Sequence, residues 1–384
     1  MSHPIIERCE QLYEDLSLEY VRAQTNATGR KAFGFMPVYF PREIVYASGL
    51  LPVGLMGAGD LLEIIKGDAY FQSYICHIPR STVEMGLSGH LDCLSGMAFP
   101  AICDVIRNLS GMWKIMFPQK ESIYFDVPQN FDPQIGGHYL VEELKQLAVR
   151  MSKISGKPVT HEALHAAIAL YNTHREWVMK CYAQRSKKPW EVPTSELYLL
   201  MRAGLILDVQ EHIEMMKAYL ESVADLDRKP MDNARVVLTG SFCEQPPIGL
   251  IRSLERAGCY IVDDDWVLVH RWIKQAIPTQ GDPYQNLADA YLNHSMDAPF
   301  KYQPERKGHQ LKQSFIENRA AGVLFCAPSF CDPALLDRPM IQKFMEAEGI
   351  PYTSFKYAEN TGQYQVIKEQ AGTFSDSLKL WGEA

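Results

Sequence analysis

The sequence predicts an α/β protein with two parallel-sheet domains of the flavodoxin or Rossmann type and a helical segment between them. Short apolar runs alternate with helical patterns in the first third of the chain and again near its end, as βαβ units do. The stretch between them carries long helical patterns without strand signals. We therefore expect an N-terminal α/β domain at 1–132, a helical linking segment at 133–230 and a C-terminal α/β domain at 231–384.

In the N-terminal part, strands and helices alternate. Pro41 suits the first turn of a helix, and the stretch Asp104–Met116 has apolar residues at helical spacing. The predicted strands are Ala32–Tyr39, Leu51–Met56, Cys93–Phe99 and Ser122–Val127, and the predicted helices follow Pro41 and cover Ser81–Leu87 and Asp104–Met116.

The remaining elements follow the same reasoning. Helical spacing predicts helices in Glu142–Ser155, His161–Arg185 and, as two segments, Ser195–Ala224. The alternation then returns with the predicted strands Val236–Ser241, Cys259–Val262, Gly322–Ala327 and Tyr352–Phe355. The predicted helices of this part are Pro247–Ala257, Ala334–Glu348 and Tyr364–Leu380.

Composition excludes several classes of protein. A formal net charge of −8 without a basic stripe argues against nucleic-acid binding. The longest apolar stretches, such as Ile44–Met56, contain polar residues, glycines or Pro52 and are too short to cross a membrane. The acidic, amphipathic N-terminus has no hydrophobic signal region, so we expect a cytoplasmic protein. Nine cysteines, an odd number, do not indicate a disulfide scaffold.

Three of these cysteines stand where an apolar run turns toward a helix, namely Cys76, Cys103 and Cys331. Ligands of open α/β sheets bind beyond the carboxyl ends of the strands, and a helix N-terminus stabilises a thiolate or an anionic cofactor. We interpret the three thiols as ligands of one iron–sulfur cluster; the alternative is three inert, half-buried thiols. Zinc is the rival metal, but the paired CxxC or Cys/His spacing of its structural sites is absent. At the third turn we expect Asp332 to cap the helix, with Pro333 at its first position.

The other cysteines have weaker indications. Cys243, after the strand Val236–Ser241, is either a fourth ligand or part of a substrate pocket, and Cys326 is expected to point into the sheet. Packing or surface roles are expected for Cys9, Cys93, Cys181 and Cys259.

Several polar residues are weaker candidates for chemistry. His77 could donate a proton, but a local hydrogen bond is the simpler interpretation. The run Asp263–Asp265 resembles a carboxylate site, yet it is more typical of a solvated strand end, and Glu244 and His270 are possible general acids without supporting geometry. No phosphate-binding GxxxxGK[ST] motif occurs, so any ATP would bind to another chain.

Nearly the whole chain resembles the 2-hydroxyacyl-CoA dehydratase and benzoyl-CoA reductase family. The segments that carry the resemblance are MPVYFPREIVYASGLLPVG, YICHIPRSTVEMGLS, FPAICDVIRNLSGMWK, YFDVPQN, GSFCEQPP, YIVDDDW, APSFCDPALLDRP, FKYAENTGQ and EQAGTFSDSLKLW. The three Cys-containing segments are general to the family. GSFCEQPP, YIVDDDW and FKYAEN favour the reductase branch, and within it the small cluster-bearing subunit of the ATP-dependent, class I enzyme.

The resemblance implies a cofactor and its ligands. In that family three cysteines per subunit hold a [4Fe–4S] cluster, and the matching residues here are Cys76, Cys103 and Cys331. The fourth iron is then open to water, sulfide or substrate. Some relatives hold a fused double cubane, so the nuclearity stays open. We expect aromatic residues such as Phe99, Phe330 and Trp113 to keep water from the centre.

The resemblance also implies partners and a reaction. These are a sibling subunit of similar fold, an ATP-hydrolysing activator with ATP on its own chains, ferredoxin as electron donor, and benzoyl-CoA, which is reduced by two electrons to a cyclic dienoyl-CoA. Three alternatives stay open: a 2-hydroxyacyl-CoA dehydratase subunit, a non-catalytic electron-relay or scaffold subunit, and a cluster-free nucleotide-binding protein.

Overall fold

Two four-stranded, all-parallel β-sheets organise the chain, and the predicted fold class is thereby confirmed. The computed structural model describes residues 3–36, 38–72, 74–128, 130–132, 134–296, 304–358 and 364–381. The first sheet has the order β2-β1-β3-β4 and comprises β1 (Ala32–Phe35), β2 (Leu51–Gly54), β3 (Leu94–Pro100) and β4 (Glu121–Phe125). The second has the order β6-β5-β7-β8 and comprises β5 (Ala234–Thr239), β6 (Cys259–Asp263), β7 (Gly322–Pro328) and β8 (Tyr352–Tyr357).

Both sheets share one topological feature that positions the site. The first strand of each sheet lies between the second and the third, so the loops after the first and third strands leave in opposite directions. This is the switch point at which open parallel sheets form a crevice at their carboxyl edge. The crevice lies between β1 and β3 in the first sheet and between β5 and β7 in the second.

The N-terminal helices fit the sequence pattern closely. The α5 helix (Asp104–Met116) has the predicted bounds and buries Ile106, Leu109 and Trp113, which share one helical face. The α4 helix (His77–Leu87) begins four residues before the predicted start at Ser81, because Pro79 lies in the first turn, where proline is tolerated. The other helices of this part are α1 (Pro4–Glu14), α2 (Glu19–Thr28) and α3 (Arg42–Ala47).

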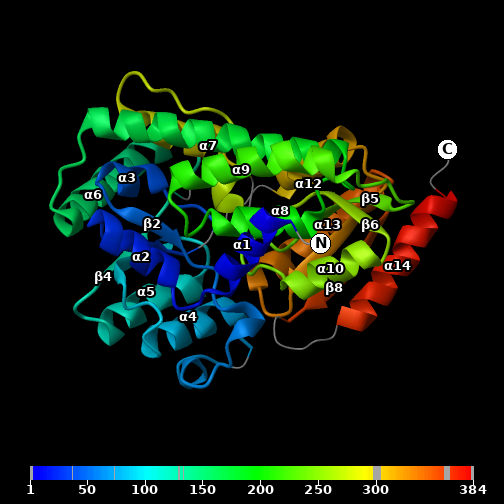
Figure 1. Cartoon of the computed structure of the whole chain (residues 1–384), viewed down its shortest axis with the longest axis horizontal. Helices are drawn as coiled ribbons and strands as arrows, with labels where there is room; N and C mark the ends of the chain where they lie inside the picture. Colours follow the sequence, from blue (N-terminus) through cyan, green and yellow to red (C-terminus); the bar gives the residue numbers. More distant parts are fainter. Residues whose placement is uncertain are drawn as a thin grey trace.

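Four helices follow β4, in the stretch predicted to be helical. They are α6 (Gly136–Ser155), α7 (His161–Lys187), α8 (Thr194–Ala203) and α9 (Val209–Val223). The 27-residue α7 contacts both α3 beside the first sheet and β6 of the second, and Figure 1 shows α7 and α9 running along one side of the molecule. These helices therefore connect the two sheets.

The C-terminal part contains helices that the sequence pattern did not reveal. It comprises α10 (Ile248–Arg256), α11 (Pro283–His294), α12 (Pro304–Glu317), α13 (Asp332–Ala347) and α14 (Tyr364–Trp381). Of these, α11 and α12 were not predicted, and α11 packs on α6 of the helical stretch. A single large hydrophobic cluster reaches from α1 to α14, while the domain boundaries at 132 and 230 remain predictions. Within the described residues, no helix combines the length and apolar character needed to span a membrane.

Candidate metal centre

Each of the three predicted ligand cysteines is the N-cap residue of a helix. Cys76 precedes α4, Cys103 precedes α5 and Cys331 precedes α13. Cys103 follows the carboxyl end of β3, and Cys331 follows that of β7, so each lies at the switch point of a different sheet. The prediction that Asp332 caps α13 is wrong: the helix begins one residue earlier, and Asp332 is its first residue.

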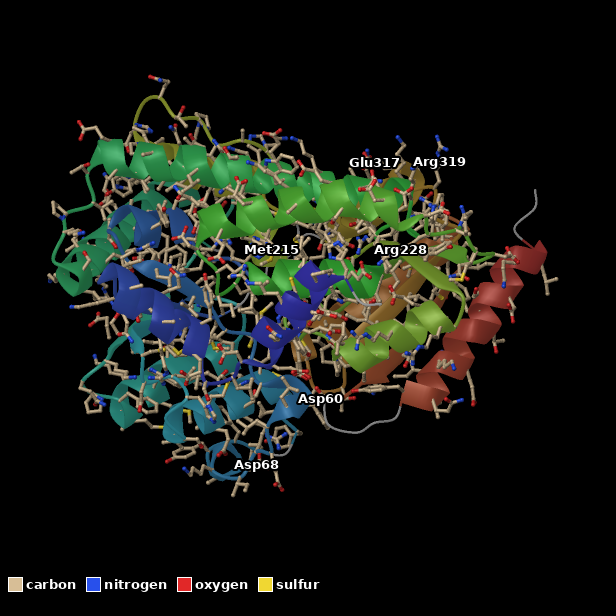
Figure 2. All side chains as sticks on the ribbon, in the orientation of Figure 1. Asp60, Asp68, Met215, Arg228, Glu317 and Arg319 are labelled. Carbon is tan, nitrogen blue, oxygen red and sulfur yellow. The ribbon has the colours of Figure 1, made fainter. Side chains whose placement is uncertain are left out.

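The segment that carries Cys76 is the long connection between β2 and α4. It contains two short 3₁₀ turns, Gly59–Leu61 and Gly67–Ala69. Asp60 and Asp68, both labelled in the lower part of Figure 2, belong to these turns. Asp68 forms an ion pair with Arg80 of α4 at 2.6 Å. The connection is therefore attached to the helix whose N-cap is Cys76.

Cys243, on the loop after β5, lies within electrostatic range of all three predicted ligands. The pKa of Cys243 is raised, first by burial and then by the charges of Cys331, Cys76 and Cys103. The pKa of Cys331 is raised by burial and also by Glu244 and Cys103. Chain segments from both sheets thus bring four cysteines to one region.

Helix N-termini oppose the effect of burial on two of these thiols. The Cys103 sulfur makes no cap hydrogen bond of standard geometry, yet the N–H groups of Val105 and Ile106 lower its pKa, while burial, the larger effect, raises it. Burial likewise raises the pKa of Cys331, and the N–H of Ala334 lowers it. These amides favour the thiolate form, which is the form that binds metal.

The predicted ligands are thiols, the usual protein ligands of iron–sulfur clusters. Among the residues that the structure describes, no three Cys, His, Asp or Glu side chains surround one point as ligands of a single ion do. Of the three thiols at helix N-termini, Cys331 is buried, whereas Cys76 and Cys103 are half-buried, and none of the nine cysteines is in a disulfide. The assignment of these three residues as ligands stays a prediction.

A buried loop after β5 connects the two halves of this region. The carboxylate of Glu244 accepts a hydrogen bond from the backbone N–H of His77 at 2.7 Å, and the hydroxyl of Tyr357 donates to the carbonyl of Glu244. Burial lowers the pKa of His77, although the charge of Glu244 opposes this. The sequence suggested Glu244 only as a general acid, because its contact with a residue 167 positions away carries no local signal.

The carboxylates at the end of β6 do not form a solvated strand end, so that interpretation is wrong. Asp264 is 4% exposed and pairs with Arg185 at 2.5 Å, and Asp263 pairs with Arg271 at 2.7 Å. Asp265 accepts hydrogen bonds from the N–H groups that follow β5. These residues fix structure through buried charge pairs and loop contacts.

The remaining predicted residues have mixed outcomes. His270 is buried and bonds to the Met201 carbonyl and to Arg42, which gives it a structural position. Phe99 and Trp113 are buried and pack against each other, with ring centroids 5.8 Å apart. Phe330 is 45% exposed, so the prediction that it shields the centre within this chain is wrong.

The other cysteines lie within the packing of the molecule. Cys326 is fully buried in β7, and burial raises its pKa. Burial also raises the pKa of Cys9, Cys181 and Cys259 to about 12, and the Cys9 thiol contacts the sulfur of Met215, labelled in Figure 2, at 3.6 Å. Such thiols are packing residues.

Known proteins match almost the entire chain. It is 54% identical over 380 residues to a benzoyl-CoA reductase subunit of Thauera aromatica, covering 98% of both chains. It is 30% identical to the "(R)-phenyllactyl-CoA dehydratase beta subunit" of Clostridium sporogenes, covering 94% of this chain and 95% of that one. It is 26% identical to the beta subunit of lactoyl-CoA dehydratase of Anaerotignum propionicum, covering 91% and 92%. These identities confirm the predicted resemblance. The protein-family model "2-hydroxyglutaryl-CoA dehydratase, D-component" matches residues 37–378, and the chain therefore belongs to that family.

Proposed function

We propose that this chain is a cluster-bearing subunit of an ATP-dependent benzoyl-CoA reductase, an oxidoreductase that reduces the aromatic ring by two electrons to a cyclic dienoyl-CoA. The observation that carries the proposal is the 54% identity over 98% of both chains to a benzoyl-CoA reductase subunit, compared with 30% to the phenyllactyl-CoA dehydratase subunit. The same proposal makes the complex part of anaerobic aromatic degradation in the cytoplasm.

In this proposal Cys76, Cys103 and Cys331 hold a [4Fe–4S] cluster. When bound, the cluster supplies one-electron transfer at low potential. The chain contributes three thiolates from helix N-termini, whose amides and partial positive charge favour the anionic ligands. Burial of Cys331 and of its neighbour Cys243 limits the access of water. Cys243 lies near the three thiols, and a role as a further ligand in a larger centre belongs to the same proposal.

The proposal includes partner chains. The relatives of this chain are themselves subunits of larger enzymes, and we infer a sibling subunit, an ATP-hydrolysing activator and ferredoxin as the electron source. Large apolar side chains flank the predicted ligands on the surface: Tyr74 is 63% exposed, Phe330 45% and Leu336 73%. Exposed apolar surface of this kind is typical of interfaces, so it supports a partner at the site.

Ligand substitution tests the proposal directly. Cys76→Ser, Cys103→Ser and Cys331→Ser should each lower iron and acid-labile sulfide in the anaerobically purified chain and weaken its electron paramagnetic resonance signal, because a serine oxygen is a poor cluster ligand. Cys93→Ser is the matched control, since Cys93 is half-buried but lies before β3, away from any helix start. Wild-type cluster content in all three ligand variants would refute the assignment.

A 2-hydroxyacyl-CoA dehydratase subunit is the second candidate, supported by the family match and by the 30% identical relative. The two functions differ in net redox change, because elimination of water is redox-neutral. The assembled complex with activator, reductant and ATP should reduce benzoyl-CoA and leave a 2-hydroxyacyl-CoA unchanged. Dehydration without ring reduction would favour the second candidate.

A further inference from the structure

The loop after β5 contains a carboxylate whose position within the site has a specific consequence. Glu244 is 3% exposed, and its Oε2 accepts the N–H of His77 at 2.7 Å. His77 is the first residue of α4, and Cys76 is its N-cap. A side chain from the second sheet's loop therefore satisfies the first amide of a helix that belongs to the first sheet.

A carboxylate from another part of the chain caps α4. The first amides of any helix lack partners within the helix, and a carboxylate is a favoured partner there. In α5 and α13 the amides act on the cysteine sulfur itself. In α4 the first amide, that of His77, donates to the Glu244 carboxylate. The carboxylate thus holds the start of α4 from outside the helix.

The loop that carries Glu244 is itself held by several buried hydrogen bonds. The hydroxyl of Tyr357 donates to the Glu244 carbonyl, and the Gln245 side chain bonds to the Ser241 carbonyl at 3.1 Å and the Val267 N–H at 3.0 Å. The Ser241 hydroxyl donates to the carbonyl of Cys326 at 2.5 Å. Because the loop has little freedom, the position of Glu244 fixes the distance between Cys76 and the second sheet.

Glu244 also places a negative charge at the site. Its Oε2 lies 2.7 Å from the backbone nitrogen of His77, the residue after Cys76, and Glu244 itself directly follows Cys243 in the sequence. The carboxylate therefore lies beside cysteines from both sheets, and its effect on the pKa of Cys331, which burial raises more strongly, agrees with this position. An added negative charge beside an anionic cluster makes reduction less favourable, because net charge and hydrogen bonding set cluster potentials.

We propose that Glu244 is a positioning residue for the centre: it locks the Cys76 helix to the second sheet and lowers the reduction potential of the cluster. This inference rests on the proposed ligation by Cys76, Cys103 and Cys331. It assigns two separable roles to one carboxylate, a hydrogen bond and a charge.

The two roles separate in two variants. Glu244→Gln keeps an oxygen that can accept from His77 but removes the charge, so iron content should stay near wild type while the midpoint potential becomes less negative. Glu244→Ala removes both, and iron affinity should fall by about 10–100-fold, the range for loss of an outer-sphere partner. Both are measured on the full-length chain after anaerobic reconstitution, by iron and sulfide analysis and by a redox titration followed by electron paramagnetic resonance.

Glu255→Gln is the matched control. Glu255 of α10 accepts the N–H of Ser195, in the first turn of α8, at 3.0 Å, so it performs the same capping chemistry. It lies near the end of α10, shortly before Gly258 and the amino end of β6, at the opposite edge of the sheet from Cys331. Its substitution should leave iron content and potential unchanged.

Comparison with the wild type separates the possible outcomes. A wild-type chain that binds no iron would overturn the proposed function itself. A wild-type chain with a full cluster, combined with a Glu244→Gln potential no different from that of Glu255→Gln, would overturn the inference about Glu244 alone. A positive shift confined to Glu244→Gln supports it, and so does iron loss in Glu244→Ala with an unchanged circular dichroism spectrum.

Discussion

At the scale of single residues, the backbone position decides the chemistry of cysteine in this chain. Cys326 and Cys331 are close in the sequence and both are buried. Cys326 lies inside β7, where its backbone groups pair with β8. Cys331 precedes a helix, and the N–H of Ala334 in the first turn of that helix lowers the pKa of its thiol, against the larger effect of burial. Only the second setting favours a thiolate, which is why the sequence could separate ligand candidates from packing residues by their place at a turn.

Asp265 gives a prediction at the same scale. Burial raises its pKa from the ordinary 3.8 to about 7, although the N–H groups of Gly240 and Ser241 oppose this. The native state therefore holds a proton that the unfolded chain has released, and the stability contributed by this group falls as pH rises from about 4 to about 7. Relative to Asp265→Asn, the wild type should lose about 2 kcal/mol of unfolding free energy between about pH 5 and about pH 7.

Urea unfolding of both chains at several pH values measures this difference. The sign is the informative part, because an ion-paired aspartate with a lowered pKa gives the opposite slope. Asp263, whose pKa the guanidinium of Arg271 holds below its usual range, is such a group. A difference between wild type and Asp265→Asn that is flat with pH would contradict the argument.

At the scale of elements, the local sequence pattern is sufficient to predict a helix that packs one apolar face against a sheet. The α5 helix matches its prediction because Ile106, Leu109 and Trp113 recur at helical spacing. The α12 helix was missed because its sequence is polar and packs chiefly on α13. The start of α6 at Gly136 was missed because two glycines there give no helical signal.

The candidate site shows the same limit. Cys76, Cys103 and Cys331 could be identified from the sequence because each stands between an apolar run and the start of a helix. The bond from His77 to Glu244 joins residues from different sheets, and no local pattern encodes which loops meet. Local patterns therefore identify the ligand candidates, while the group that fixes their spacing is visible only in the fold.

Glycine positions test the packing of elements. At Gly204, which ends α8 with an ordinary φ of −67°, an added Cβ would overlap the ring of His212. Gly204→Ala should therefore displace His212 from its hydrogen bond to His174 and destabilise the protein by about 3 kcal/mol. The measurement is the urea unfolding free energy at neutral pH.

Gly111 provides the opposite case. It lies inside α5, and an added Cβ would meet nothing within 4 Å. Gly111→Ala should stabilise the protein by about 0.5–1 kcal/mol, because alanine loses less backbone entropy in a helix. Equal effects of the two substitutions would show that the packing around Gly204 is looser than described.

At the scale of the whole molecule, a buried polar cluster joins the parts of the chain; we call this cluster of Arg42, His174, His212 and His270 the polar seam. The guanidinium of Arg42, at the start of α3, bonds to His270 Nδ1 at 2.7 Å, beside the second sheet. His174 of α7 bonds to His212 of α9 at 2.8 Å, and the three imidazoles pack with centroids 5.0 to 5.6 Å apart. Since this cluster contacts all three parts of the chain and the main hydrophobic cluster reaches from α1 to α14, we expect one cooperative unfolding transition.

The seam also predicts how acid unfolds the protein. Burial lowers the pKa of His174, His212 and His270, and Arg42 lowers each of them further. Neighbouring imidazoles add to the lowering at His174 and His270, and the pKa of His212 falls from 6.5 to about 4. The unfolded chain takes up protons below about pH 6.5 while the native state does not, so stability is fully present above that pH and is lost as pH falls toward 4. Each imidazole contributes up to about 1.4 kcal/mol of unfolding free energy per pH unit, and the three together outweigh the opposite pH dependence of Asp265.

The variant His212→Asn tests this argument. It should be less stable than the wild type at neutral pH, but its unfolding free energy should fall less steeply between about pH 6 and pH 5. The control His138→Asn, at an exposed position, should keep the pH dependence of the wild type. An unchanged slope in His212→Asn would mean that the seam takes up protons without unfolding, and the two sheets would then be held together by the apolar core alone.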